Sequence, residues 1–159
     1  MAKARKIPAL ADAESFRVAA AAAVEVRAEE VFEHRGGVLD TTDIERVHDM
    51  RVATRRLRAA MEIFGDAFPK APHKRLLDEV KTLADALGER RYRDVAIGAL
   101  RAAAADLTAT ERPGLRHLED ELRGEQEQAN EELGRALDAV DGGGLRERLL
   151  AHAAEARGL

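Results

Sequence analysis

Four arginines and one histidine lie close together near the middle of the chain, in the stretch His48-Asp-Met-Arg51-Val-Ala-Thr-Arg55-Arg56-Leu-Arg58. On a helix, a rotation of 100° per residue places the histidine and three of the arginines within about 80° of one another. We call this set the arginine row: His48, Arg51, Arg55 and Arg58. Arg56 falls on a different side. The apolar residues of the same helix fall roughly opposite the row and form a core-facing stripe: Val47, Met50, Ala53, Leu57, Ala60, Met61 and Phe64.

A row of like charges three and four residues apart destabilises a helix by a few tenths of a kcal/mol per pair, so it needs an explanation. Guanidinium groups about one helical turn apart can bind successive phosphates of a polyanion bidentately. Two other interpretations stay open. The row is an ordinary solvated face, or acidic residues of the first helix, such as Glu25, Glu29 and Glu33, neutralise it. The spacing does not decide whether His48 contributes a charge, a hydrogen bond or only packing.

More cationic residues follow along the chain. Lys74 and Lys81 are seven residues apart, on the face of their helix that points away from its leucines. Further on, three arginines cluster beside Asp94, and an acid in such a cluster can hold arginine side chains in place: they are Arg90, Arg91 and Arg93. The alternative is a surface network of salt bridges.

Apolar residues recur at helical spacing along most of the chain, and Gly and Pro residues separate the periodic segments. Thr42 and Glu45 form a capping-box pattern at the start of the arginine-rich helix. Gly88 is expected to break or kink a helix. The pattern predicts helices over about 13–35, 42–64, 73–87, 89–107, 113–140 and 145–157. We therefore expect an all-α fold, an antiparallel bundle of four to five helices at residues 13–159 after an N-terminal tail at 1–12.

The composition excludes several classes of protein. Aromatic residues make up 3% of the 159 residues, which disfavours a sheet protein, and the absence of cysteine excludes disulfides and thiolate sites. No apolar run is long enough to cross a bilayer, and no signal-peptide pattern is present. The net charge of −4 is unevenly distributed, because residues 46–101 hold 13 basic and 8 acidic residues, a net of +5. A local anion site is one interpretation of this asymmetry.

The arginine-rich stretch resembles the signature helix of the CHAD family, α-helical domains named for a conserved histidine. Residues 48–58 match its pattern H-x-x-R-x-x-x-R-R-L-R at every fixed position. The later segment Leu87-Gly88-Glu-Arg-Arg91-Tyr92-Arg93-Asp94-Val95 is similar to the L-G-x-x-R-D-x-D-V segment of the same family. Together the two segments span about 48 residues, Val47 to Asp94.

The resemblance implies a helical bundle that binds inorganic polyphosphate through basic side chains and has no catalytic activity. The residues that it implies as ligands are His48, Arg51, Arg55, Arg56, Arg58, Lys81 and Arg91, and Lys74 joins them as the neighbour of Lys81 on the same face. Asp94 is expected to orient the arginines. Tyr92 departs from the pattern, because an aspartate usually stands there. We expect neither a cofactor nor a metal ion.

The chain is also shorter than the resemblance implies, since domains of the family are usually about twice this size and contain two related bundles. No second arginine-rich helix is present in the sequence. Two interpretations follow: the chain is a fragment of such a domain, or it is a half-domain that a homodimer completes. We favour a symmetric homodimer that places two such helices across a shared basic groove. The expected location is the cytoplasm, in association with polyphosphate granules.

Other functions are consistent with parts of the pattern. A basic helix face could follow any phosphate backbone, although few aromatic residues are present to stack on bases, so nucleic acid is an unlikely ligand. A helical module that only binds other proteins is a further alternative. The pair His48-Asp49 is reminiscent of metal-dependent phosphohydrolases, but adjacent helical residues diverge by about 100° and the other histidines form no H-x-x-x-H pair.

Overall fold

The computed structural model describes residues 3–7 and 15–158, and all regular structure in these residues is helical. This result confirms the all-α class and the bundle of five helices. The helices are α1 (Phe16–Glu33), α2 (Ile44–Ile63), the short 3-10 helix η2 (Gly65–Ala67), α3 (Lys70–Ala104), α4 (Arg112–Gly142) and α5 (Leu145–Gly158). None of the described helices is long and apolar enough to span a membrane.

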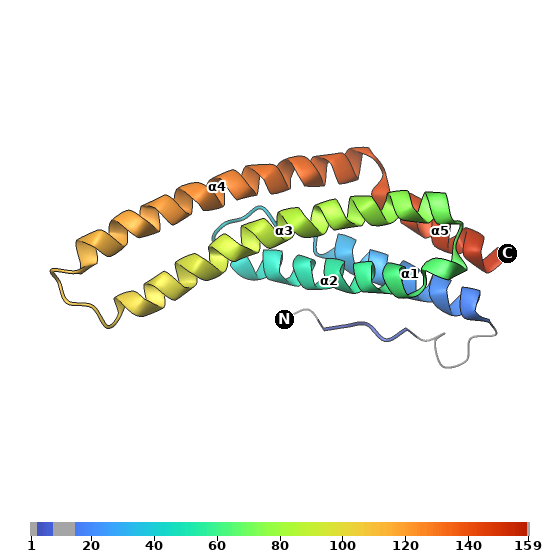
Figure 1. Cartoon of the computed structure of the whole chain (residues 1–159), viewed down its shortest axis with the longest axis horizontal. Coiled ribbons are helices and arrows are strands. Elements are labelled where there is room, and N and C mark those ends of the chain that lie inside the picture. The colour runs from blue at the N-terminus through green and yellow to red at the C-terminus, as the bar shows by residue number, and fades with distance from the viewer. Residues whose placement is uncertain (1–2, 8–14, 159) are drawn as a thin grey trace.

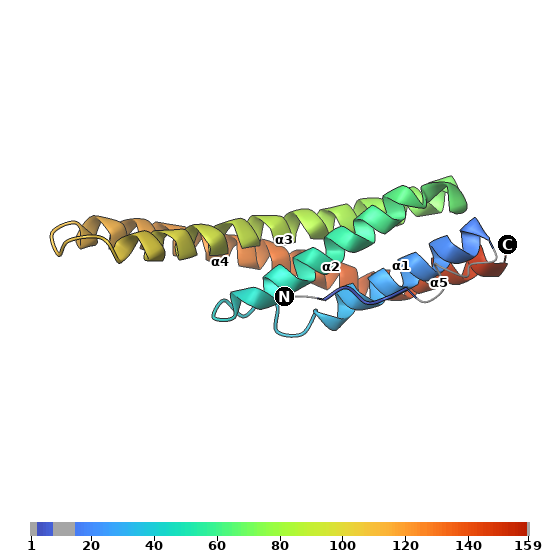
Figure 2. The same ribbon diagram turned by 90° about the horizontal axis from the view of Figure 1, so that it is seen from below.

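The two longest helices, α3 and α4, form an antiparallel hairpin that runs the length of the molecule (Figure 1). Helix α2 packs against α3, and α1 packs against both α2 and α5. The end of α3 and the start of α4 project beyond the other helices in both views (Figure 1, Figure 2). We call this projecting part, residues 95–125, the arm. It lies outside the main hydrophobic core, which no residue of the arm joins.

The core forms from one face of each helix, as the apolar periodicity predicts. Six residues of the predicted α2 stripe are buried, and Phe64 packs against the core while half-buried. Helix α1 contributes a run of buried alanines at 19–23, whose small side chains let α2 and α5 approach closely. Because the stripe of α2 faces inward, its opposite side is left at the surface, where the arginine row lies.

The predicted break at Gly88 was wrong, because α3 is one continuous helix of 35 residues. A glycine inside a helix costs about 1 kcal/mol relative to alanine, and the packing of α3 against α2 and α4 outweighs that cost. A side chain at position 88 would meet no atom within 4 Å, so the residue leaves open space beside the helix. The helix also begins earlier than expected, at Lys70, with Pro72 in its first turn, where a missing N–H costs little.

The predicted capping box at Thr42 was also wrong. Helix α2 begins after Asp43, which makes no side-chain capping bond. The backbone N–H and the hydroxyl of Thr42 both donate to Oδ1 of Asp40, at 2.9 and 2.7 Å. The carboxylate of Asp40 therefore takes the Thr42 hydroxyl that was expected to cap the helix, and this contact closes a local turn. Glu45 lies beside Arg91 of α3, with 3.7 Å between the charged atoms.

The first helix and the N-terminal segment are connected by polar contacts. Helix α1 starts at Phe16, with the Ser15 hydroxyl accepting a hydrogen bond from the N–H of Val18; the expected start at residue 13 lies outside the described residues. Of the expected tail, residues 3–7 are described. There Arg5 pairs with Glu33, and its backbone N–H donates to Glu30 at 2.5 Å.

Two histidines that the sequence analysis did not single out form a buried pair between α3 and α5. His73 Nδ1 lies 3.0 Å from His152 Nε2, and His73 Nε2 lies 2.8 Å from the carbonyl oxygen of Met61. The Phe68 ring stacks on both imidazoles, with centroids 4.8 and 4.6 Å away. Because a carbonyl oxygen only accepts, His73 carries its proton on Nε2, and His152 must donate to His73 Nδ1. The two imidazoles are therefore held in one arrangement, with a proton on Nε2 of each ring.

This arrangement predicts a loss of stability in mild acid. Burial, and then the neighbouring His73, lower the pKa of His152 below its ordinary value of 6.5, with Glu155 opposing the shift. Below pH 6.5 the unfolded chain therefore binds a proton that the folded chain does not. We expect the free energy of unfolding to fall by up to about 1.4 kcal/mol per pH unit until the lowered pKa of His152 is reached.

Urea unfolding between pH 8 and pH 5, at a fixed protein concentration, measures this effect. The variant His152→Gln should lose the dependence, whereas His117→Gln, at an exposed position of α4, should keep it. Parallel loss of stability in the wild type and in His152→Gln would contradict the prediction.

Candidate functional site

Three arginines of the row line one wall of a groove between α2 and α3. Arg51, Arg55 and Arg58 form this wall, and the cavity between the helices has a volume of about 510 Å³. The other wall comes from α3: Ala84, Asp85, Gly88 and Glu89. The open space beside Gly88 belongs to this groove. The structure thus brings together three of the predicted ligands. We call this cavity and its lining residues the α2–α3 groove.

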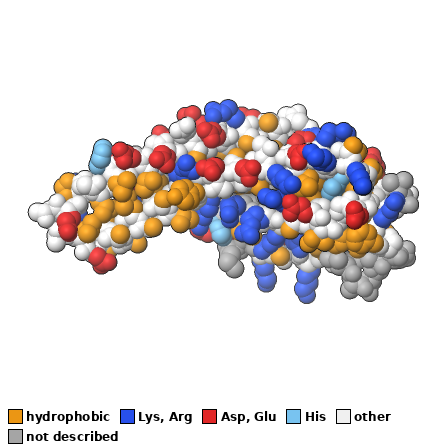
Figure 3. Space-filling model, viewed as in Figure 1, with side chains coloured by type: hydrophobic (Ala, Val, Ile, Leu, Met, Phe, Trp, Pro, Cys, Tyr) orange, Lys and Arg blue, Asp and Glu red, His pale blue; other side chains and the backbone are white. Residues whose placement is uncertain are grey.

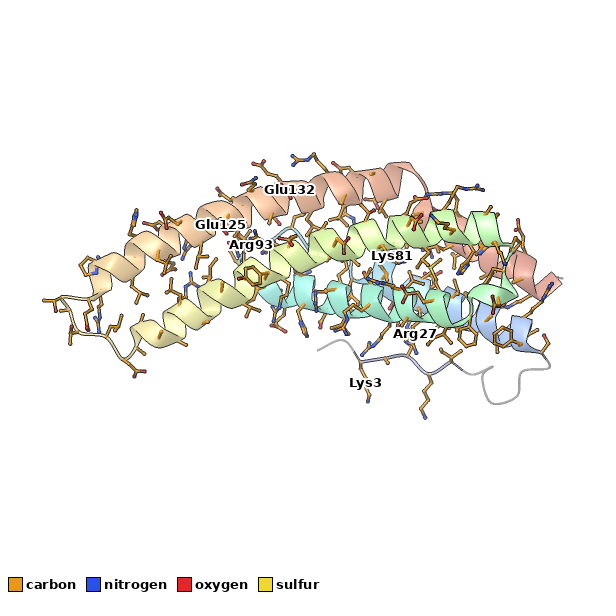
Figure 4. All side chains as sticks on the ribbon, viewed as in Figure 1. Lys3, Arg27, Lys81, Arg93, Glu125 and Glu132 are labelled. Carbon is orange, nitrogen blue, oxygen red and sulfur yellow. The ribbon has the colours of Figure 1, made fainter. Side chains whose placement is uncertain are left out.

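The two walls of the groove differ in charge. Within the described residues, Arg51 and Arg55 take part in no ion pair, although most other arginines do. Asp85 and Glu89 place carboxylates on the opposite wall. Glu89 is paired with Arg93, which also lies 3.5 Å from Glu125 (Figure 4). The groove is therefore basic along α2 and acidic along α3, rather than basic throughout.

One carboxylate connects the two walls at one end of the groove. Glu62 Oε1 accepts a hydrogen bond from Arg58 Nε at 3.0 Å and lies 3.6 Å from Lys81 Nζ. Figure 4 shows Lys81 on α3, on the side next to α2. The hydrogen bond from Arg58, and then the charges of Arg58 and Lys81, lower the pKa of Glu62. Glu62 is thus ionised and holds both cations.

Acidic residues of α1 do not neutralise the arginine row. Glu25 pairs with Arg157, and Glu33 pairs with Arg5. Glu29 accepts three hydrogen bonds from Arg146, the shortest at 2.7 Å. All three therefore bind arginines outside α2, and the interpretation that they neutralise the row was wrong.

His48 lies one turn before the groove and is not one of its lining residues. It is half-buried, and one of its ring nitrogens lies within 4.8 Å of a carboxylate oxygen of Glu45 and of one of Asp49. These three residues could hold a metal ion. Glu45 is three residues before His48 and four before Asp49, so all three side chains share one turn of α2 although His48 and Asp49 themselves diverge. Arg56 is half-buried on another side of α2, away from the groove.

The remaining predicted ligands lie outside the groove. The Lys74 side chain is 78% exposed and pairs with Asp78 at 2.9 Å, about two turns before Lys81. Arg91 donates a hydrogen bond to the carbonyl oxygen of Ile44 at 3.2 Å, at the first turn of α2. Arg91 therefore connects α3 to the start of α2, a structural contact that the sequence did not indicate.

Asp94 holds one of the three clustered arginines, inside the protein. Its Oδ1 accepts hydrogen bonds from Arg90 Nε at 3.0 Å and from Gln126 Nε2 at 2.6 Å. Both charged side chains are fully buried. Arg90 also donates to the side-chain oxygen of Asn130, at 2.5 Å, and Asn130 donates to the carbonyl oxygen of Leu39. We call these four residues the buried polar cluster: Arg90, Asp94, Gln126 and Asn130.

The buried polar cluster is not among the features predicted from the sequence, although a signal for it is present. Leu83, Leu87, Arg90, Asp94 and Ile97 follow one another at spacings of four and three, so the charged pair continues the apolar stripe of α3. An oppositely charged pair four residues apart within such a stripe indicates a buried ion pair when a polar partner is available.

The sequence model of the CHAD domain matches residues 22–158, nearly the whole chain, and the chain therefore belongs to the CHAD family. Comparisons with curated proteins and with solved structures gave no match.

The buried polar cluster predicts a large and asymmetric response to substitution. The variant Asp94→Leu leaves the Arg90 guanidinium buried without its charged partner, and we expect it to lose about 3–5 kcal/mol of unfolding free energy. Adding Arg90→Met removes the unpaired charge and should restore at least half of that loss, which a double-mutant cycle in urea measures. A loss below about 1 kcal/mol in Asp94→Leu would contradict the buried pair.

Proposed function

We propose that the protein binds inorganic polyphosphate in the α2–α3 groove, without catalysing a reaction. The observation that carries the proposal is the pair of arginines, Arg51 and Arg55, that line a surface groove with no ion pair among the described residues. Membership of the CHAD family, which is associated with polyphosphate binding, supports the same ligand.

The spacing of the wall suits a repeating anion. Along the axis of α2, Arg55 lies about 6 Å beyond Arg51, and Arg58 lies about 10.5 Å beyond Arg51. Each guanidinium presents a planar set of donors that matches two phosphate oxygens. The carboxylates of Asp85 and Glu89 repel an anion, so the phosphate chain lies along α2 rather than across the groove. Binding through exposed charges weakens as salt concentration rises.

Glu62 acts as an internal competitor in this scheme. It occupies Arg58 and Lys81 with a single carboxylate, at 3.0 and 3.6 Å. A polyphosphate that reaches the end of the groove displaces this carboxylate and takes both cations. His48, one turn before Arg51, adds a further donor at the opposite end of the row, and the proposal assigns it no catalytic step.

Nucleic acid is the main competing ligand, because it too is a repeating phosphate. The acidic wall and the scarcity of aromatic residues disfavour it, since the single tyrosine lies outside the groove. The proposal also includes a homodimer that completes the basic groove. It places the protein in the cytoplasm, on polyphosphate granules where these form.

The double variant Arg51→Ala/Arg55→Ala tests the ligand and the site together. We expect at least a tenfold loss of affinity for polyphosphate of defined length. A tenfold loss corresponds to about 1.4 kcal/mol of binding free energy, and the loss of two bidentate contacts should cost more than that. The control Arg75→Ala/Arg135→Ala removes the same charge from exposed arginines that have no ion pair within the described residues. It should change the affinity less than twofold.

The measurement is fluorescence anisotropy with polyphosphate and with single-stranded DNA, at equal phosphate concentration and at two salt concentrations. Equal affinity for the two polymers would overturn polyphosphate as the ligand. Equal losses in the two double variants would overturn the groove as the site.

Substitution of the competing carboxylate should have the opposite effect. In Glu62→Gln, Arg58 and Lys81 lose their anionic partner, so we expect polyphosphate to bind about two- to fivefold more tightly, the range that exposed ion pairs typically represent. Glu131→Gln, at an exposed position of α4, controls for the change in net charge. The same titration measures both variants, and an affinity for Glu62→Gln at or below that of the control contradicts the role of Glu62.

A further inference from the structure

A pocket separate from the α2–α3 groove lies where the arm leaves the rest of the molecule. Its volume is about 370 Å³, and Figure 1 shows α2 beginning beside the α3–α4 hairpin at the base of the arm. Three segments line it: the residues around the start of α2, the part of α3 from Asp94 to Arg101, and the facing part of α4 from Arg123 to Gln126. The pocket and the α2–α3 groove share no lining residue. We call this cavity the arm pocket.

The burial of its lining residues gives the arm pocket a floor and a mouth. Asp94, Ile97 and Gln126 are buried and form the floor. Arg101 and Arg123 are exposed and form the mouth. A ligand that enters the pocket therefore passes two cations before it reaches the buried carboxylate.

The floor holds a hydrogen-bond acceptor that the protein does not use. Asp94 Oδ1 accepts hydrogen bonds from Arg90 and Gln126, but Oδ2, which is buried, has no partner within the described residues. In the same ion pair, Arg90 Nη2 is a buried donor that also lacks a partner there. A buried polar atom without a hydrogen bond costs about 1–3 kcal/mol. A hydroxyl group suits such a place, because it both donates and accepts.

The mouth favours an anion. Arg101 Nε and Arg123 Nη2 both donate to Oε1 of Glu119, at 2.9 and 2.8 Å, so two cations share one carboxylate. Ile44, the first residue of α2, also lines the pocket, and Asp43 before it makes no side-chain capping bond. The first turn of a helix has N–H groups without intrahelical partners and a partial positive charge. Arginines beside a helix N-terminus are a combination that binds phosphate groups.

From these features we infer that the arm pocket binds a small polyol phosphate, with a hydroxyl at the floor and the phosphate at the mouth. The hydroxyl donates to Asp94 Oδ2, and Arg101, Arg123 and the start of α2 hold the phosphate. Because Oδ2 is covered, the side chains around it shift slightly when the ligand enters. Along the axis of α3, Arg101 lies about 10.5 Å beyond Asp94, and its side chain leans back toward the start of the helix, so a short ligand spans the two.

Other ligands fit the arm pocket less well. The inner phosphates of polyphosphate carry no O–H at neutral pH, so they cannot donate to Asp94, and its carboxylate repels them. An ammonium group could donate to Asp94 but is repelled by Arg101 and Arg123 at the mouth. In Figure 3 the Lys and Arg side chains gather over α2, whereas the visible face of the arm is mainly hydrophobic. A long polyanion is therefore attracted to the α2–α3 groove rather than to the arm.

Two glycine amides distinguish the pocket from the groove in a nuclear magnetic resonance titration. Gly98 lines the arm pocket, and Gly88 lines the α2–α3 groove. We titrate the wild-type chain with glycerol 3-phosphate, ribose 5-phosphate and glucose 6-phosphate, which differ in length. At least one should shift the Gly98 amide saturably and leave Gly88 unchanged. The same polyol without phosphate, and inorganic phosphate alone, should each bind at least tenfold more weakly, because each contacts only one end of the pocket.

Two results of this titration overturn the inference. If none of the three compounds shifts Gly98 saturably up to about 10 mM, the pocket holds only water. If inorganic phosphate binds as tightly as the best polyol phosphate, the hydroxyl at the floor contributes nothing.

The variant Gly98→Leu blocks the pocket without changing any charge. Gly98 lies four residues after Asp94 and three before Arg101, on the face that lines the pocket, and a Cβ there meets no atom within 4 Å. We expect at least tenfold weaker binding of the best polyol phosphate. The matched control is Gly124→Leu, at a helical glycine of α4 with equally open surroundings outside the pocket, and it should change the affinity less than twofold.

Urea unfolding and circular dichroism check that both variants fold. Replacing a glycine inside a helix removes a cost of about 1 kcal/mol relative to alanine, so neither variant should lose stability. Equal affinities of Gly98→Leu and Gly124→Leu for the polyol phosphate overturn the arm pocket as the site.

This inference and the proposed polyphosphate site can fail separately. Arg51→Ala/Arg55→Ala retains the arm pocket and should bind the polyol phosphate as the wild type does. Gly98→Leu retains the groove and should bind polyphosphate as the wild type does. Loss of the polyol phosphate in Arg51→Ala/Arg55→Ala would place its phosphate in the groove and overturn the inference.

Discussion

The arrangement of the helices depends on one ion pair that has no access to water. Arg90 and Asp94 lie on consecutive turns of α3, and both side chains are fully buried. A buried charge is stable only when it is paired and hydrogen-bonded, so α4 must place Gln126 and Asn130 against them. Asn130 in turn binds the carbonyl oxygen of Leu39, before α2, while the adjacent Arg91 binds the first turn of α2. The wall of the groove on α2 is therefore positioned from the middle of α3.

Arginine has two separate uses in this protein. Many arginines connect helices, as Arg146 does with Glu29 of α1 and Arg148 does with Glu79 of α3. Arg51 and Arg55 have no such partner among the described residues, although acidic residues are numerous in the chain. The glutamates of α1 bind other arginines instead. This division leaves cationic side chains along the groove between α2 and α3.

Local periodicity in the sequence was sufficient to predict the helices and the outward face of α2. The same periodicity could not predict the continuity of α3 through Gly88, because helix propensity is weaker than the packing of α2 and α4 on either side. Thr42 was assigned to a capping box because the competing acceptor, Asp40, lies outside that pattern. The acidic wall requires knowledge of which helices are neighbours. The position of Arg90 and Asp94 in the apolar stripe of α3 indicates their burial, but their partners Gln126 and Asn130 on α4 are known only from the structure.

Glu62 gives the proposed site a dependence on the length of its ligand. A short phosphate chain that spans Arg51 and Arg55 leaves the contacts of Glu62 with Arg58 and Lys81 intact. A chain that extends about one further turn along α2 must first break both contacts before it gains the two cations. The binding free energy therefore does not increase evenly with each added phosphate. In the proposed function it rises, levels off where Glu62 is displaced, and rises again, so that a single carboxylate would make the site discriminate long polymers from short ones.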